Sequence, residues 1–377
     1  MNRDLKLIFN TNLVGAFGDG LFSYLLPVYL GNSLGADSVQ IGVLYAVMAL
    51  VAAFTLLVSG SLADKYDRKT IMILGWVAWL PVPLIFSVAT NWVGMLPGMV
   101  LYGFWLGGPS STAYIVTTAD PSKLTMTFTV MSAGWSIGYI FSPAIGGFLA
   151  ANVGMKLVFY LSFVFYAVAT SSLFFIKSQR GVSVDARSGE QFSFLKLLRV
   201  RRLLGYAAFF AALMFVLSMF RPFVPKFVSD IYKSNDFTIG VLGSITFASS
   251  AVIGILLGRL GDKSSKKHAL ALTLILNSIA LPLLVLSGNF GVLVLSFILI
   301  SGSYMTFSLM NAIVGPLAPE SCRAHWVAVP QVVAMFASFL APYVGGFLYA
   351  YSPQYPFIIA MIAMPLLAFV VVRFFKK

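Results

Sequence analysis

The chain contains twelve apolar stretches, most of them about 20 residues or longer, separated by polar gaps. A helix needs about 20 mainly apolar residues to cross the hydrocarbon core of a bilayer. Hydrophobic residues make up 59% of the chain and charged residues 10%, whereas soluble domains have about 45–50% and about 25%. The sequence therefore excludes a water-soluble enzyme and predicts an all-α membrane protein.

Residues 177–201 form the one long polar gap, and six stretches lie on each side of it. We therefore expect two six-helix bundles, 1–176 and 202–377, joined by a cytoplasmic linker. The first stretch is too long for the apolar core of a signal peptide, so we expect it to remain as a helix. The expected spans are 7–31, 39–60, 70–89, 92–118, 125–151, 154–176, 202–227, 237–259, 268–288, 290–315, 326–350 and 354–375.

Lysine and arginine set the expected orientation. The gaps on one side, together with both termini and the linker, hold 21 of the 25 basic residues, whereas Lys156, Lys226 and Lys233 fall in gaps on the other side. Basic loops stay in the cytoplasm, so we expect a multi-pass protein of the cell membrane with both termini cytoplasmic. Basic residues that bind nucleic acid cluster on a folded surface, so these scattered gap residues indicate no nucleic-acid partner.

The two halves repeat one another with an offset of 198–200 residues. The loop pattern G-x-L-x-D-K-x-x-[RK]-K occurs twice, and so does a Pro-x-x-Gly-Gly pattern in spans 5 and 11. Pro27 and Pro225 also correspond, as do the charges that follow spans 4 and 10. The repeated loop and packing residues are Gly60, Leu62, Asp64, Lys65, Arg68, Lys69, Asp120, Lys123, Pro143, Gly146 and Gly147, with Gly258, Leu260, Asp262, Lys263, Lys266, Lys267, Glu320, Arg323, Pro342, Gly345 and Gly346 in the second half.

With this loop, repeat and span count, the chain resembles the major facilitator superfamily. The hallmark of that family is the loop G-x-L-a-D-r-x-G-R-K between helices 2 and 3, and Asp67 stands here where the family usually has Gly. The Pro-x-x-Gly-Gly pattern is similar to a motif of the family's drug and proton antiporters, although Ser142 and Ala341 replace the Gly before the Pro. The resemblance implies twelve helices in two pseudo-symmetric six-helix bundles and transport by alternating access.

The repeated loop is expected to form a cytoplasmic gating latch. Gly60 would let a neighbouring helix approach closely, and the resemblance implies that Asp64 faces the start of helix 11. Arg68 is expected to pair with Asp120. A solvated loop that obeys the positive-inside rule is the alternative, but the duplicated Asp favours a latch. The Pro-Gly-Gly segments fit a moving interface and ordinary helix packing equally well.

Asp19 is the only acidic residue within an expected span, and Arg221 is the only basic residue well inside one. A charge at the bilayer centre needs a partner, a wet cavity or a proton. By the 198 offset Arg221 corresponds to Ser23, one helical turn from Asp19, so the two charges are expected to face a common cavity. Asp19 is then a proton carrier, an ion-pair partner of Arg221, or an acid held by Asn12 or another polar group of a helix. Arg221 alternatively anchors an anionic substrate.

Family architecture places helices 1, 4, 7 and 10 around the cavity, which makes Trp105, Tyr304 and Asn311 candidate cavity residues. Ordinary helix packing is the alternative for the two aromatic residues. Gln331 and Asn277 are expected to bind neighbouring helices instead. The Arg that family antiporters often carry in helix 4 is absent, because Gly103 occupies its place.

The sequence predicts a secondary transporter for a small molecule. It contains no G-x-x-x-x-G-K-[ST] loop for ATP. One Cys and two His indicate no metal site, cofactor or enzyme activity, while a lipid scramblase stays open. We favour proton-coupled export of a hydrophobic or amphipathic compound by a monomer in the bilayer. The alternative is a carrier of an anionic metabolite, by uniport, symport or exchange, with Arg221 as its anchor.

Overall fold

The computed structural model describes residues 1–180, 200–317 and 323–375, with the backbone alone at 64, 125, 201, 316 and 323–328. These residues are almost entirely helical, and their only β-bridge joins Asp67 to Arg180. Ten helices or joined helix pairs in the described ranges are long and apolar enough to cross a membrane. The other two expected spans, 92–118 and 125–151, are a broken helix and a 29-residue helix that contains Pro143.

The helices of both halves follow one another closely along the chain. Those of the first half are α1 (Arg3–Ser23), α2 (Leu26–Asn32), α3 (Ser38–Lys65), α4 (Arg68–Trp79), α5 (Val82–Val88), α6 (Trp92–Tyr102), α7 (Gly107–Thr118), the 3₁₀ turn η1 (Pro121–Lys123), α8 (Leu124–Asn152) and α9 (Met155–Phe174). Those of the second half are α11 (Arg201–Phe220), α12 (Phe223–Tyr232), α13 (Asp236–Lys263), α14 (Lys266–Val285), α15 (Phe290–Ile300), η2 (Ser301–Met305), α16 (Thr306–Val314), η3 (Gly315–Leu317), α17 (Arg323–Ser338), α18 (Ala341–Tyr351) and α19 (Tyr355–Phe374).

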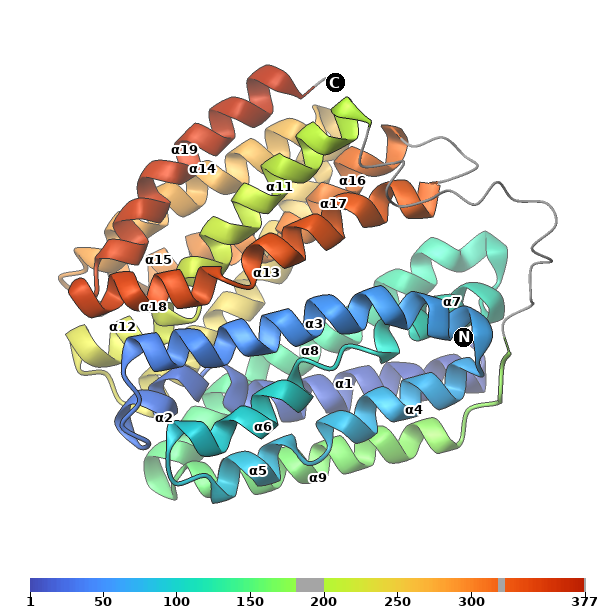
Figure 1. Cartoon of the computed structure of the whole chain (residues 1–377), viewed down its shortest axis with the longest axis horizontal. Helices are drawn as coiled ribbons and strands as arrows, with labels where there is room; N and C mark the ends of the chain where they lie inside the picture. Colours follow the sequence, from blue (N-terminus) through green and yellow to red (C-terminus); the bar gives the residue numbers. More distant parts are fainter. Residues whose placement is uncertain (181–199, 318–322, 376–377) are drawn as a thin grey trace. The chain divides into compact units, whose positions relative to one another are not determined.

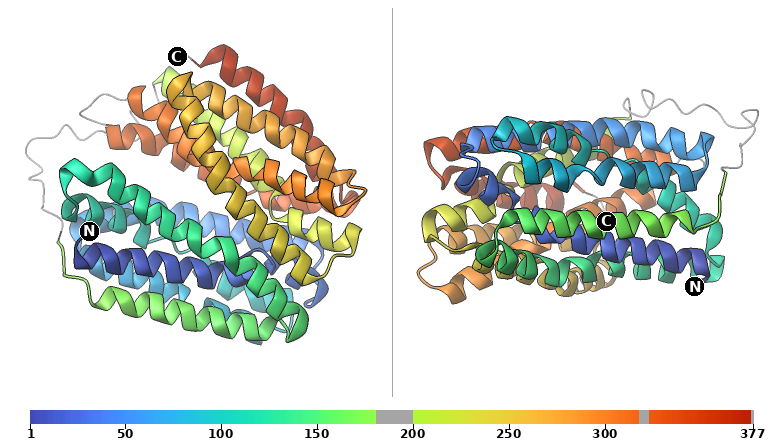
Figure 2. Two further views of the ribbon diagram at one scale, coloured as in Figure 1. Left: turned by 180° about the vertical axis from the view of Figure 1, so that it is seen from behind. Right: turned by 90° about the horizontal axis from the view of Figure 1, so that it is seen from below.

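The contacts group the chain into two compact units. Unit 1 holds Met1–Asp37, Val47–Arg187 and Pro225–Ser244, and unit 2 holds Ser38–Ala46, Ser188–Val224 and Ile245–Lys377. In unit 1, α1 lies between α8 and α9 (Figure 2). In unit 2, α11 packs against α17 and α14 packs against α19 (Figure 1). Most of the expected linker lies outside the described residues.

Spans 4 and 10 break at corresponding positions. In span 4 the helix stops at Tyr102 and restarts at Gly107, where a continuous span was expected. Thr55 of α3 covers this break. Its hydroxyl oxygen accepts from the Trp105 N–H at 3.2 Å, and its one proton is shared between the Gly103 carbonyl at 3.2 Å and the Val51 carbonyl of its own helix at 2.9 Å. In span 10 the same place is taken by η2. A broken membrane helix needs such partners, because lipid offers none to the freed backbone groups.

The loops after spans 1 and 7 share one backbone feature. Gly35 has φ +64° and Lys233, 198 positions later, has φ +51°. The left-handed region suits glycine and is unfavourable for a residue with a Cβ atom. The repeat therefore preserves the turn even where the glycine has been lost.

The two Pro-Gly-Gly segments make equivalent backbone contacts in the two units. In unit 1, a Cβ atom on Gly146 would overlap the Leu21 carbonyl, and one on Gly147 would overlap the Asp236 carbonyl. In unit 2, the corresponding contacts join Gly345 to Met219 and Gly346 to Ser38. Each glycine pair thus brings its helix against two others with no side chain between them, which is how small residues allow close packing in membranes.

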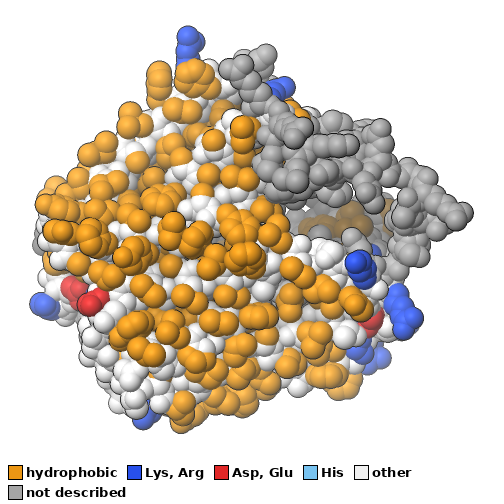
Figure 3. Space-filling model, in the orientation of Figure 1, with side chains coloured by type: hydrophobic (Ala, Val, Ile, Leu, Met, Phe, Trp, Pro, Cys, Tyr) orange, Lys and Arg blue, Asp and Glu red, His pale blue; other side chains and the backbone are white. Residues whose placement is uncertain are grey.

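Apolar side chains are spread across the visible surface, and charged side chains lie toward its margins (Figure 3). Phe54, Phe141 and Phe369 are each more than half exposed, as expected for lipid-facing residues. The charge count placed Lys226 in a gap, but it lies within α12, is 8% exposed, and pairs with Asp230 at 2.9 Å.

Candidate functional site

Three glycines of α1 allow Asp19 to be buried. A Cβ atom on Gly15 would overlap the Trp76 ring of α4, one on Gly18 would lie 2.7 Å from Phe165 of α9, and one on Gly20 would overlap Ser142 of α8. Neighbouring helices therefore approach α1 closely on several sides. Asp19 lies among these glycines and is only 2% exposed.

Three tyrosine hydroxyl groups donate hydrogen bonds to the Asp19 carboxylate. Tyr102 and Tyr166 bind Oδ1 at 2.5 and 2.6 Å, and Tyr139 binds Oδ2. Ser23 lies one turn further along α1. Two carboxylate oxygens offer about four acceptor positions, so these donors nearly saturate the group. No Lys or Arg pairs with Asp19 among the described residues.

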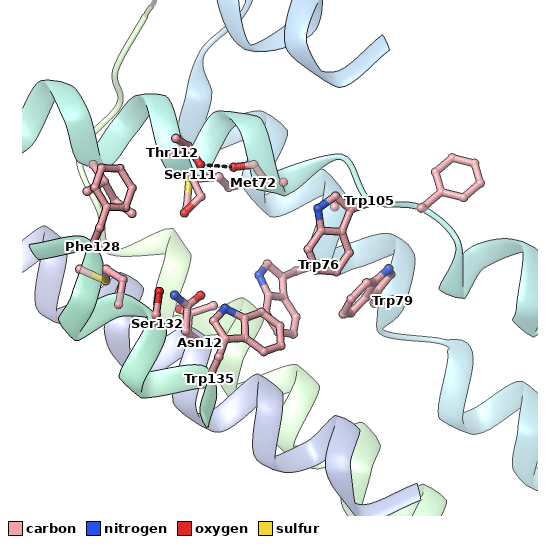
Figure 4. Close-up of a pocket in the computed structure, with 17 residues that line it drawn as sticks. Asn12, Met72, Trp76, Trp79, Trp105, Ser111, Thr112, Phe128, Ser132 and Trp135 are labelled. Carbon is pink, nitrogen blue, oxygen red and sulfur yellow. Dashed lines mark hydrogen bonds between the residues drawn. The ribbon is translucent and has the colours of Figure 1, made fainter. Parts of the chain in front are cut away.

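A pocket of about 240 Å³ lies in unit 1 between α1, α4, α7 and α8. Four of the six tryptophans line it, and we call it the tryptophan pocket. Figure 4 shows Trp76, Trp79 and Trp105 toward one end, and Ser111, Thr112 and Phe128 toward the other. The lining residues are Thr11, Asn12, Met72, Gly75, Trp76, Trp79, Phe104, Trp105, Gly107, Gly108, Ser111, Thr112, Ile115, Phe128, Met131, Ser132 and Trp135.

Each tyrosine that binds Asp19 also contacts a tryptophan of this pocket. Tyr102 packs on Trp79 with ring centroids 5.5 Å apart. Tyr166 meets Trp76 edge-on at 5.8 Å. Tyr139 stacks on Trp135 at 6.2 Å. The carboxylate is therefore separated from the tryptophan pocket by one layer of tyrosine side chains.

Arg221 lies in unit 2, at the turn between α11 and α12. Its Nη2 donates to the Ser303 carbonyl in η2 at 2.5 Å, and the guanidinium lies 5.0 Å from the centre of the Tyr304 ring. Its Nε and the Ser303 hydroxyl are buried without a hydrogen-bond partner among the described residues. Arg221 thus donates a hydrogen bond to a backbone carbonyl at the break in span 10, much as Thr55 does at the break in span 4.

The structure brings some of the sequence-predicted cavity residues together and separates others. Arg221 meets Tyr304, and Trp105 lines the tryptophan pocket. Asp19 and Arg221 belong to different units, and each finds its described partners within its own unit. Asn12, expected as a possible partner of Asp19, lines the pocket instead.

In the described part of the chain, one of the two amide side chains expected to bind neighbouring helices does so, and the other does not. Asn311 accepts a hydrogen bond from Gln331 at 2.6 Å, which links α16 to α17. Asn277 was expected to bind a neighbouring helix. Its amide donates to Thr273 of its own helix instead, and its Oδ1 has no partner among the described residues.

The repeated loop makes contacts that the sequence did not predict. Arg68 donates to Thr117 at 2.7 Å and to Gln179 at 2.8 Å, rather than to Asp120. Asp120 instead caps η1 and accepts from Ser122. A Cβ atom on Gly60 or on Gly258 would meet no described atom of its own unit within 4 Å, so neither glycine admits a close neighbour there.

Asp67, the residue that departs from the family loop, caps the start of α4. Its carboxylate accepts from Thr70 at 2.9 Å and from the Gln179 N–H at 2.7 Å. Partial burial alone would raise the pKa of Asp67, but the hydrogen bonds from Gln179, Ser178 and Thr70 lower it overall. The loop is thereby fastened to the segment that follows α9.

The last lysine of each loop motif binds the end of the last helix in its half. Lys69 donates to the Phe174 carbonyl of α9 at 2.7 Å. Lys267, 198 positions later, donates to the Phe375 carbonyl after α19 at 3.0 Å. A cation at a helix C-terminus satisfies free carbonyls and complements the helix dipole.

The structure describes some of the other residues of the expected latch and leaves others outside the described residues. Leu62, Lys65, Asp262 and Lys263 lie at the ends of α3 and α13. The side chains of Asp64 and Arg323 lie outside the described residues, and so does all of Glu320.

The tyrosines around Asp19 and three of the four pocket tryptophans were missed by the sequence analysis. Tyr102, Tyr139 and Tyr166 lie 83, 120 and 147 positions from Asp19. Aromatic residues in membrane spans usually serve packing, so periodicity did not single them out. Asp19 itself indicates that hydrogen-bond donors must lie near it, because a buried carboxylate requires them.

The chain is similar in sequence to one protein family and to two named efflux or resistance proteins. Residues 8–234 and 208–377 each match the sequence profile of the Major Facilitator Superfamily. The "Multi-drug resistance efflux pump PmrA homolog" of Lactococcus lactis subsp. lactis (strain IL1403) is 24% identical over 93% of this chain and 91% of its own. The "Quinolone resistance protein NorA" of Staphylococcus aureus (strain Mu50 / ATCC 700699) is 25% identical over 96% and 94%.

Among solved structures, a crystal structure of a variant of the nucleoside transporter NupG superposes with a TM-score of 0.85. It is 15% identical and covers 99% of this chain and 100% of that one, so this likeness speaks for the fold alone. It confirms the all-α membrane fold and the expected count of twelve spans.

Proposed function

The chain belongs to the major facilitator superfamily, and we propose that it exports a hydrophobic or amphipathic small molecule in exchange for protons. Membership makes it a multi-pass membrane transporter rather than an enzyme. Two curated relatives are named as a multidrug efflux pump and a quinolone resistance protein, which supports export of such compounds. The proposal includes a plasma-membrane location with both termini in the cytoplasm, and a monomer as the working unit.

The observation that carries proton coupling is the buried carboxylate of Asp19, which pairs with no Lys or Arg in the described part of the chain. A charge near the bilayer centre costs about 2.5–3.5 kcal/mol on insertion scales, and a bound proton removes that charge. Hydroxyl groups can donate to a carboxylate and can also accept from a carboxylic acid. The three tyrosines are thus suited to hold Asp19 in both protonation states, as a reversible proton carrier requires.

The test uses purified protein in liposomes with a pH-sensitive dye inside. Lipophilic cations, neutral aromatic compounds and organic anions are added in turn to the wild type and to Asp19→Asn. Substrate-driven proton movement that disappears in the mutant supports the proposal. Proton movement that persists in a correctly folded Asp19→Asn protein would show that another group carries the proton.

A second candidate function is transport of an anionic metabolite by way of Arg221. It is favoured by the buried Nε and the Ser303 hydroxyl, which lack described partners and would be satisfied by a carboxylate or phosphate oxygen. Uptake of an organic anion that is lost in Arg221→Gln but retained in Asp19→Asn would favour this function. Retention of drug-driven proton movement in Arg221→Gln would favour the first.

A further inference from the structure

We propose that the tryptophan pocket binds an uncharged, planar aromatic molecule that carries one hydrogen-bonding group. The inference rests on the proposed function in one respect, because this molecule would be the exported substrate. It narrows the substrate from amphipathic compounds in general to neutral aromatic ones.

The indole rings of the pocket are arranged to pack against an aromatic ligand. Trp76 and Trp135 lie nearly parallel, with planes 18° apart and ring centroids 6.4 Å apart. Trp79 and Trp105 meet at 52° with centroids 5.3 Å apart. Aromatic rings favour offset-stacked and edge-to-face neighbours with centroids about 4.5–7 Å apart. A flat ring entering this end of the pocket would find both kinds of surface.

The described lining residues carry no charge, so we expect the ligand to be uncharged. None of the 17 described residues that line the pocket is Asp, Glu, Lys, Arg or His. Asp19 lies behind the tyrosines that contact the pocket tryptophans, and its oxygens accept hydrogen bonds from their hydroxyls. Cation–π attraction returns about 0.5–2 kcal/mol, whereas removing an ion from water costs several. An uncharged ligand avoids that cost.

Polar side chains of the pocket can bind the hydrogen-bonding group of the ligand. The amide of Asn12 and the hydroxyls of Ser111 and Ser132 have no hydrogen-bond partner among the described residues. The hydroxyl of Thr112 is already used, because it donates to the Gly108 carbonyl at 3.1 Å (Figure 4). An amide or hydroxyl group on the ligand would find hydrogen-bond partners among these three side chains.

Three probes that share the naphthalene ring system but differ in charge separate the effect of charge from that of shape. Protein in lipid nanodiscs is titrated with 2-naphthamide, 2-naphthoate and 2-(aminomethyl)naphthalene, which carry a neutral, an anionic and a cationic group. Binding is read from quenching of tryptophan fluorescence and checked by equilibrium dialysis. We expect 2-naphthamide to bind at least about tenfold more tightly than either ion. Equal or tighter binding of the ammonium or the carboxylate would overturn the proposal.

Two variants locate the binding. Ser132→Phe fills the pocket from α8 and should weaken 2-naphthamide binding at least about tenfold. Ser136→Phe makes the same change one turn later at an exposed position outside the pocket and should leave binding unchanged. Trp105→Leu, at a side chain that is 42% exposed, provides a second test with little risk to folding. Wild-type affinity in both folded pocket variants would place the ligand elsewhere.

The two proposals fail in different assays. Binding of 2-naphthamide in nanodiscs without substrate-driven proton movement in liposomes would refute proton-coupled export and leave the pocket assignment standing. Proton movement driven by cations, with no naphthamide binding, would refute the pocket assignment and leave proton coupling standing.

Discussion

Tyr139 stacks on Trp135, with ring centroids 6.2 Å apart and planes 19° apart, while its hydroxyl group donates to Asp19. One side chain thus contacts both the buried acid and the wall of the tryptophan pocket. If a proton binds the oxygen that Tyr139 contacts, that oxygen becomes a donor and the tyrosine hydroxyl hydrogen must turn away. The arrangement gives protonation of Asp19 a direct physical effect on the pocket wall.

Removing the Tyr139 hydroxyl should shift the pH dependence of transport. Tyr139→Phe keeps the stacked ring but deletes one donor to the carboxylate, and a hydrogen bond to a charged group is worth about 1.5–3 kcal/mol. The anion becomes less stable, so the pH of half-maximal proton release should rise by about one to two units. Proton flux in liposomes measures this shift. Tyr160→Phe, at an exposed position on α9, is the matched control, and an equal shift in it would contradict the assignment.

Replacing Lys233 by glycine should stabilise the protein. Lys233 has φ +51° where the first half has Gly35, and a left-handed residue with a Cβ atom costs about 1–2 kcal/mol. Lys233→Gly should raise the Tm in detergent by roughly one to three degrees. Gly35→Ala should lower it. A stabilising effect of Gly35→Ala would show that the turn is not the source of strain.

Adding one methyl group at the glycine contacts should destabilise both units. Gly147→Ala and Gly346→Ala place a Cβ atom against a backbone carbonyl of another helix, and overpacking costs about 1–3 kcal/mol. Gly205→Ala is the control, because an added Cβ atom there meets nothing within 4 Å and the residue is exposed on α11. Thermal unfolding of the three variants tests the prediction. Similar losses in all three would mean that helix packing at the Pro-Gly-Gly segments is not tight.

The Asp67 cap should show a defined pH window. Asp67→Ala removes the N-cap of α4, which typically costs about 1 kcal/mol. Hydrogen bonds hold the pKa of Asp67 below its ordinary value of 3.8, so its stabilising effect is fully present above that value and is lost as the pH falls through the lowered pKa. The Tm difference between wild type and Asp67→Ala should stay constant from about pH 8 to 5 and shrink only in stronger acid. A difference that vanishes near pH 6 would point to another group.

The sequence allowed much of the scaffold to be predicted, because scaffold features repeat. Span count depends on apolar length, and the contacts of Gly147 and Gly346 correspond at the 199 offset. The break in span 4 was missed, although Gly103 and Pro109 flank it, since the stretch is apolar throughout. Its stability depends on Thr55, a partner 48 positions away, and local sequence does not reveal such a contact.

The chemistry was harder to predict because it does not repeat. At the same offsets, Asp19 corresponds to Leu217 and Trp76 to Leu274, and Trp135 corresponds to Ala334. The halves therefore share backbone packing but differ in acid and aromatic residues. Asp19 could be chosen from sequence because a lone acid within a membrane span is expensive, whereas the partners that make it tolerable come from three other helices.

If Asp19 carries the proton, as we propose, its single carboxylate limits the concentration gradient that the transporter can build. With one proton carried inward per neutral molecule expelled, each cycle moves one elementary charge, and 100 mV of proton-motive force then supplies about 2.3 kcal/mol. At about 1.4 kcal/mol per tenfold concentration ratio, such a carrier sustains a gradient of roughly forty-fold per 100 mV. However fast it turns over, its stoichiometry fixes how far it can deplete the cell of its substrate.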